Sequence, residues 1–74
     1  MTRRKTTPLP KFAVGDRIVA WANCPVGPMY TEGDEVTVML IIPGATVPFI
    51  YEVEQDDGHT YTTTGIYWDK AVLR

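Results

Sequence analysis

Short runs in which apolar and polar residues alternate dominate this chain, and they predict β-strands. Within residues 17–22 the apolar positions Ile18 and Ala20 alternate with Val19 and Trp21. Successive strand residues point to opposite faces of a sheet, so this spacing is typical of a strand. Apolar side chains on both faces indicate a strand that is covered on both sides.

Three more segments show the same alternation. In residues 35–42, Val36, Val38 and Leu40 are in phase, so we expect these side chains to share one buried face. Glu52 and Glu54 alternate with apolar residues in the second and mark its solvent face. The three predicted strands cover residues 35–42, 49–55 and 59–64.

Turn signals separate these strands. Gly15-Asp16 and Gly33-Asp34 each stand immediately before a strand. Glycine permits the bend, the aspartate side chain can bond to nearby backbone, and the β-branched residues that follow prefer a strand. Asp57-Gly58 predicts a two-residue hairpin turn between the third and fourth strands.

The end of the chain is predicted to close the sheet. Gly65 permits a bend, and Asp69 is expected to cap a single helical turn before a last short strand. We therefore expect an all-β, five-stranded small barrel with no helix of ordinary length. The predicted organisation is a flexible basic tail over residues 1–11 and one barrel domain over residues 12–74.

Three stretches carry a resemblance to a known fold. Residues 12–19, 32–38 and 67–74 resemble the strand starts and the closing turn of Src-homology-3-like small barrel proteins of bacteria and bacteriophages. The resemblance implies a Src-homology-3-like barrel and a small accessory or modulator protein of a bacteriophage or mobile element. The signalling members of this fold carry an acidic early loop, whereas residues 23–31 here have no charge, so proline-rich ligands are not implied.

Charge is distributed unevenly. The 74 residues carry a net charge of −2, yet residues 1–11 hold four of the seven basic residues and none of the nine acidic ones. The predicted domain is therefore acidic, with a net charge of −6. An acidic body does not suit duplex nucleic acid, which needs cations along its phosphates.

Cysteine and histidine each occur once, as Cys24 and His59. They can form neither an internal disulfide nor a structural zinc site, and we expect no metal, no cofactor and no enzymatic activity. The basic start of the chain is not followed by an apolar run, so we expect no signal peptide, no membrane segment and a cytoplasmic protein.

Two long uncharged stretches, residues 18–31 and 37–51, are the candidate contact surfaces. Exposed apolar loops mark partner contacts, although such loops can also fold back over the open ends of a barrel. The thin core of so short a chain, without a disulfide or metal, also favours a homo-oligomer. We predict a module that binds a protein partner of unknown identity. The residues expected to anchor that partner are Trp21, Met29, Tyr30, Val47 and Tyr67.

A nucleic-acid-associated barrel is the first alternative. In that interpretation Arg3, Arg4 and Lys5 contact phosphate while Trp21 and Tyr67 stack on bases. The test that separates the two hypotheses is whether binding depends on the basic tail and on salt.

An enzymatic alternative rests on a second resemblance. Residues 15–18 and 64–67 are similar to the strand start and the pore-lining segment of plasmid-borne type II dihydrofolate reductases, which are small barrels that work as tetramers. The glutamine that binds cofactor and substrate in that family is replaced here by Gly65. Without this amide the ligands lose the hydrogen bonds that orient them.

Overall fold

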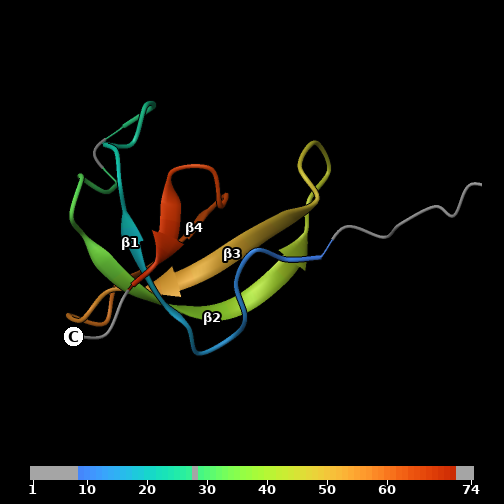
Figure 1. Cartoon of the computed structure of the whole chain (residues 1–74), viewed down its shortest axis with the longest axis horizontal. Coiled ribbons are helices and arrows are strands. Elements are labelled where there is room, and N and C mark those ends of the chain that lie inside the picture. Colours follow the sequence, from blue (N-terminus) through green and yellow to red (C-terminus); the bar gives the residue numbers. More distant parts are fainter. Residues whose placement is uncertain (1–8, 28, 72–74) are drawn as a thin grey trace, which may run out of the picture.

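The computed structural model of the chain describes residues 9–27 and 29–71. All regular structure in this part of the chain is β-strand, as the sequence predicted (Figure 1). The first four strands agree with the predicted segments to within two residues at each end. The strands are β1 (Arg17–Ala20), β2 (Glu35–Pro43), β3 (Phe49–Glu54), β4 (Thr60–Thr63) and β5 (Trp68–Lys70).

The five strands form one antiparallel sheet in the order β4-β3-β2-β1-β5, and this sheet is open. The prediction of a closed barrel is not met, because β4 and β5 are the two edges and do not pair. Successive antiparallel pairings make β4 and β5 run in the same direction. A parallel pair needs a crossover of about a dozen residues, whereas residues 64–67 alone join these strands.

Side chains bridge the two edges where the backbone does not. Trp68 Nε1 donates a hydrogen bond to Thr63 Oγ1 at 3.1 Å, which joins the first residue of β5 to the last residue of β4. The Trp68 ring packs against Tyr30, with ring centroids 4.8 Å apart. The indole is fully buried and polar only at its Nε1, so this hydrogen bond satisfies its single donor.

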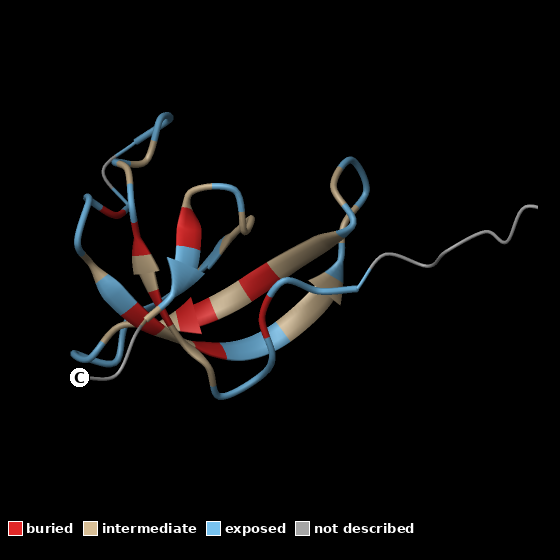
Figure 2. Ribbon diagram, in the orientation of Figure 1, coloured by how far each residue is buried: buried red, intermediate tan, exposed pale blue. Residues whose placement is uncertain are grey.

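The core follows the predicted period of two. Ile18, Val36, Val38 and Val53 have no exposed surface and come from the three central strands, β1, β2 and β3 (Figure 2). Burying a side chain of this size stabilises the fold by about 1.5–3 kcal/mol. The remaining buried residues are Phe12, Ala20, Tyr30, Tyr51 and Trp68.

Leu40 departs from the predicted pattern. We expected it to share the buried face with Val36 and Val38, but it is 49% exposed. The register shifts between Val38 and Leu40, because Val38 faces Val53 while Leu40 faces Glu52. One extra residue in a strand is a β-bulge, and a shift of one residue moves every later side chain to the other face.

The first Gly-Asp pair, Gly15-Asp16, forms a hydrogen-bonded turn before β1. Asp16 Oδ2 accepts a hydrogen bond from the backbone N–H of Ala13 at 3.0 Å, and Asp16 N–H donates back to the carbonyl of Ala13 at 3.0 Å. Gly15 has φ of +95°, a left-handed conformation that glycine adopts without strain. Its N–H then reaches the carbonyl of Val38 at 2.7 Å and fixes the turn to β2.

The second Gly-Asp pair, Gly33-Asp34, repeats this geometry before β2. Asp34 Oδ2 accepts from the N–H of Thr31 at 3.0 Å, Asp34 N–H donates to the carbonyl of Thr31 at 3.0 Å, and Gly33 has φ of +96°. The N–H of Gly33 reaches the carbonyl of Ala20 at 2.8 Å. The two turns therefore hold opposite ends of the β1–β2 pair.

Replacing Asp34 with alanine should lower the free energy of unfolding by about 1 kcal/mol, because the N–H of Thr31 loses its acceptor. Urea unfolding followed by circular dichroism measures the change. Glu32→Ala, at an exposed position of the same loop, is the matched control and should stay within about 0.5 kcal/mol of the wild type. Equal effects of the two substitutions would contradict the role assigned to the Asp34 side chain.

The chain leading to β1 is fixed to the sheet from Lys11 onward. Lys11 N–H donates to the Tyr51 hydroxyl at 2.8 Å, and Lys11 Nζ lies 3.3 Å from Asp69 Oδ1. Lys11, which we assigned to the tail, therefore contacts β3 and β5. Asp69 lies within β5, so the predicted helical turn that it would cap is wrong.

Tyr61 carries the one polar side-chain atom that is buried without a hydrogen-bond partner in the part of the chain described, its hydroxyl oxygen. Desolvation raises the pKa of Tyr61 to about 12, and the Asp34 carboxylate adds to the shift. The folded state thus retains a proton that the unfolded chain loses near pH 10. The free energy of unfolding should therefore decrease as the pH rises from about 10 to about 12.

Replacing Tyr61 with phenylalanine should flatten this alkaline decrease. Urea midpoints at about pH 7 and about pH 11 should differ less for the variant than for the wild type. At neutral pH the variant should be as stable as the wild type or more stable, because no hydrogen bond is lost. A clear loss of stability at neutral pH would show that the hydroxyl has a partner.

Candidate functional site

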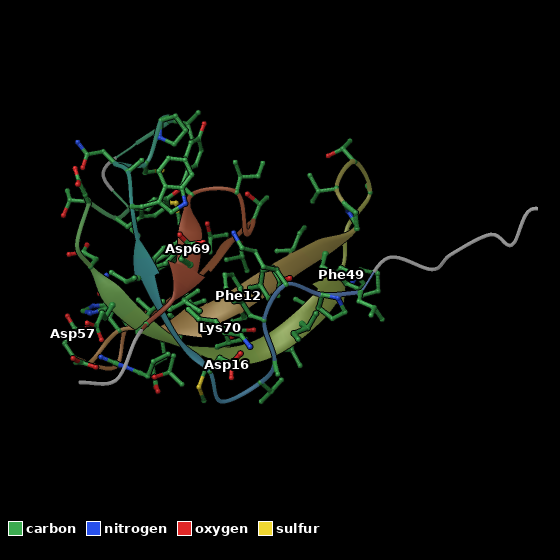
Figure 3. The ribbon with its side chains drawn as sticks, in the orientation of Figure 1. Phe12, Asp16, Phe49, Asp57, Asp69 and Lys70 are labelled. Carbon is green, nitrogen blue, oxygen red and sulfur yellow. The ribbon has the colours of Figure 1, made fainter. Side chains whose placement is uncertain are left out.

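Three connections project from the same side of the sheet (Figure 1). They are the β1–β2 loop (residues 21–34), the β2–β3 loop (residues 44–48) and the β4–β5 connection (residues 64–67). In the view of Figure 1 the β4–β5 connection, in red, stands between the other two. The β3–β4 turn lies beside the start of β2, where Figure 3 labels Asp57, and lines neither of the two grooves described below.

The first groove, which we call the Met29 groove, lies between the β1–β2 loop and the β4–β5 connection. Its volume is about 190 Å³, and its lining has no charged side chain. Met29 and Val26 are exposed, and Cys24 is half-buried. The lining residues are Cys24, Pro25, Val26, Met29, Tyr30, Thr62, Thr63, Thr64 and Tyr67.

The second groove, which we call the Phe49 groove, lies on the other side of the connection and is larger, at about 400 Å³. Its one charged lining residue is Lys11, whose Nζ is bound to Asp69 and to the carbonyls of Gly65 and Trp68. Figure 3 labels Phe49 at the end of this groove near the β2–β3 loop. The lining residues are Leu9, Lys11, Val47, Pro48, Phe49, Tyr51, Thr64, Gly65 and Ile66.

Trp21 and Tyr67 form an aromatic pair beside the Met29 groove. Their ring centroids are 5.4 Å apart with an interplanar angle of 59°, and Trp21 N–H donates to the Tyr67 carbonyl at 2.9 Å. Trp21 remains 50% exposed. The hydrogen bond and the ring contact hold a large, half-open apolar side chain in one place, which is how interface anchors are commonly built.

Tyr30, which we predicted as an exposed anchor because it lies in a loop, is buried. Tyr30 is 6% exposed, because its ring stacks on Tyr61 at 6.4 Å and packs against Trp68 at 4.8 Å. Its carbonyl also accepts the Cys24 N–H at 3.0 Å, which closes the β1–β2 loop on itself. Tyr30 therefore forms the floor of the Met29 groove and anchors the loop to the core.

The other predicted anchors are divided between the two grooves. Met29 and Tyr67 line the Met29 groove with Trp21 beside it, whereas Val47 lines the Phe49 groove. The three basic residues of the alternative hypothesis, Arg3, Arg4 and Lys5, lie outside the described residues.

Ile66 is an exposed apolar residue that sequence reasoning did not select. It lines the Phe49 groove and stands beside Gly65, whose backbone lies against the core. A Cβ added at Gly65 would lie 3.3 Å from the Tyr51 ring and 3.5 Å from the Phe12 ring. A glycine followed by an apolar residue in a short connection was the available signal, since close backbone approach turns the next side chain outward.

The ionisable groups that could suggest catalysis are engaged elsewhere. His59 Nδ1 lies 3.0 Å from Asp57 Oδ2, and hydrogen bonds from the backbone and the ring of His59 lower the pKa of Asp57. Both belong to the β3–β4 turn, away from Cys24 in the β1–β2 loop. No group of three or more histidine, cysteine or acidic side chains that could hold a metal ion occurs in residues 9–27 and 29–71.

A third hollow, of about 590 Å³, lies near the β3–β4 turn and is acidic. Arg17 spans it, with Nη1 at 2.9 Å from Asp56 Oδ1 and Nη2 at 3.2 Å from Glu35 Oε1. The hydrogen bond with Asp56 raises the pKa of Arg17. These pairs join β1 to its neighbour β2 and to the β3–β4 turn, which is a structural role.

None of the described residues belongs to a helix that could cross a membrane. The candidate site consists of two apolar grooves whose lining has no unpaired charged side chain. Residues 64–67 separate the grooves, and the half-exposed Trp21 lies beside one of them. Comparisons of the chain with protein-family models, curated proteins and solved structures give no match.

Proposed function

We propose that the chain is a non-enzymatic protein-binding module that holds an apolar segment of a partner across the β4–β5 connection. The observation that carries the proposal is the exposed apolar rim around the two grooves. Trp21, Val26, Met29 and Ile66 are all large, apolar and solvent-exposed, and all lie in or beside the grooves. Exposed apolar residues gathered in this way mark partner contacts.

A Src-homology-3-like architecture is part of the proposal. An antiparallel sheet of five short strands in which β5 returns to pair with β1 supports it. In this arrangement the long β1–β2 loop and the β2–β3 loop flank a contact surface. Here the β1–β2 loop lines the Met29 groove and the β2–β3 loop lines the Phe49 groove.

Non-enzymatic binding is favoured over the reductase alternative by Gly65. That family uses a glutamine amide at the corresponding position, and Gly65 has no side chain with which to orient a ligand. The Tyr51 and Phe12 rings also leave little room for a larger residue there. Fluorescence titration with reduced nicotinamide dinucleotide tests the alternative, and saturable binding would revive it.

Partner binding should depend on Trp21. After the partner has been identified by affinity capture from the source cell, titration calorimetry should give a dissociation constant at least about 10-fold higher for Trp21→Ala, because a central interface tryptophan contributes about 2 kcal/mol or more. Val14→Ala, an exposed apolar position in the turn before β1, is the matched control and should leave the constant unchanged. An unchanged constant for Trp21→Ala would place the contact elsewhere.

The nucleic-acid alternative makes a different prediction about the basic residues. Removal of residues 1–8 should leave partner binding intact if the grooves carry it. If the full chain instead binds a single-stranded oligonucleotide, and truncation and added salt both abolish that binding, the alternative replaces the proposal.

A further inference from the structure

The two edges of the open sheet differ sharply in chemistry. β5 carries Asp69 and Lys70, and charged side chains are a common means of preventing an edge strand from pairing with another chain. β4 has the sequence Thr-Tyr-Thr-Thr, without charge, proline or bulge. Threonine and tyrosine both favour strands, so β4 has only its short length as protection.

The pairing pattern shows which backbone groups of β4 face outward. Gln55 N–H donates to the His59 carbonyl at 2.7 Å, and hydrogen-bonded pairs alternate along an antiparallel ladder. Tyr61, opposite Val53, therefore directs its backbone groups to β3. Thr60 and Thr62 direct theirs to the free side, and we call these outward groups the β4 edge.

We propose that the β4 edge pairs with the β4 edge of a second copy of this chain, giving a two-fold dimer with one continuous ten-stranded sheet. An antiparallel pairing of identical strands is symmetric about one residue, and we place that axis at Thr62, whose outward groups can then pair with those of Thr62 in the second copy. Thr62 then faces Thr62 of the second copy, and Thr60 faces residue 64. Cross-strand threonine pairs are favourable in sheets.

The charge distribution suits this self-pairing. Residues 60–67 contain no charged side chain. The nearest acidic group across the sheet is Glu52, which lies opposite Thr62 on β3. In the dimer the two Glu52 residues are three strand spacings apart, or about 14 Å, which exceeds the screening length of about 8 Å at physiological salt.

Sedimentation equilibrium of the isolated protein over a wide concentration range tests the proposal without any partner. Thr62 also lines the Met29 groove, but a protein that stays monomeric would overturn the dimer and leave the proposed groove function as it stands. The wild type should change from the monomer mass of 8.3 kDa to twice that mass as concentration rises. Thr62→Lys places two like charges at the axis and should raise the dimer dissociation constant at least about 10-fold. Thr46→Lys, at an exposed position of the β2–β3 loop, is the control and should behave as the wild type.

Amide hydrogen exchange of the wild type gives a readout that does not depend on the variants. The amides of Thr60 and Thr62 should exchange more slowly at high protein concentration, while those of β5 should not change. A wild type that stays monomeric throughout would overturn the proposal. A dimer that forms equally well in Thr62→Lys, or that does not protect these amides, would also overturn it.

Discussion

Replacing Trp68 with alanine is expected to abolish the cooperative unfolding transition at 25 °C. The side chain is fully buried, packs against Tyr30 and gives the side-chain hydrogen bond between the two sheet edges. Removing a buried tryptophan costs about 3–5 kcal/mol. A single core in a chain of this size supplies about the same amount in total, so little net stability should remain.

Urea unfolding followed by circular dichroism measures this loss, with Trp21→Ala as the matched control. Trp21 has the same side chain but is half-exposed, so its removal should cost about 1 kcal/mol, the worth of its ring contact with Tyr67. Trp68→Phe separates packing from hydrogen bonding and should be intermediate. Equal losses for Trp68→Ala and Trp21→Ala would mean that the core is not centred on Trp68.

Phe12→Ala should cost about 3 kcal/mol, although Phe12 precedes every strand. The ring is 2% exposed and meets the Tyr51 ring edge-on at a centroid distance of 5.3 Å. The Lys11 ammonium lies 5.4 Å from its centroid, which adds a cation–π contact. The thermal midpoint, followed by tyrosine and tryptophan fluorescence, should fall clearly.

The exposed neighbour of this segment provides the control for Phe12→Ala. Leu9 is largely exposed, so Leu9→Ala should change the free energy of unfolding by less than about 0.5 kcal/mol. If Phe12→Ala were as mild as Leu9→Ala, the segment before β1 would not belong to the cooperative unit.

The strands and their buried faces could be predicted because one physical rule determines both. Ile18, Val36 and Val38 alternate with exposed or half-exposed neighbours, and the sheet buries them as the period of two requires. The rule fails at Leu40, because nothing in the local sequence marks the bulge that shifts the register. The open sheet was also missed, since it depends on the directions of β4 and β5 and not on their composition.

The sequence predicted the position of the β3–β4 hairpin turn, but not the length of its loop. Asp57-Gly58 does form a hairpin, and Gly58 has the positive φ of +93° that this requires. The hairpin closes from Gln55 N–H to the His59 carbonyl, however, so its loop has three residues (56–58), where we predicted two. A type I turn followed by a left-handed glycine is the usual alternative, and both arrangements use the same residues.

The candidate site shows the same division. Each uncharged stretch contributes residues to the lining of one groove, because apolar loops that flank a sheet leave apolar surface. Assignment of single residues was harder. Tyr30 is in a loop by sequence, yet three-dimensional packing against Trp68 and Tyr61 buries it. Ile66 is exposed for the opposite reason, since Gly65 takes the inward position.

The matched Gly-Asp turns have a consequence for how freely the chain can change. Because one turn is bonded to Val38 and the other to Ala20, the alignment of β1 with β2 is set at both ends. Residues 25–27 make none of the hydrogen bonds that set this alignment or close the loop, and doubling the length of such a loop costs only about 0.6 kcal/mol. Foreign recognition sequences grafted between these positions should therefore leave the framework intact, and related chains are free to diversify their specificity there.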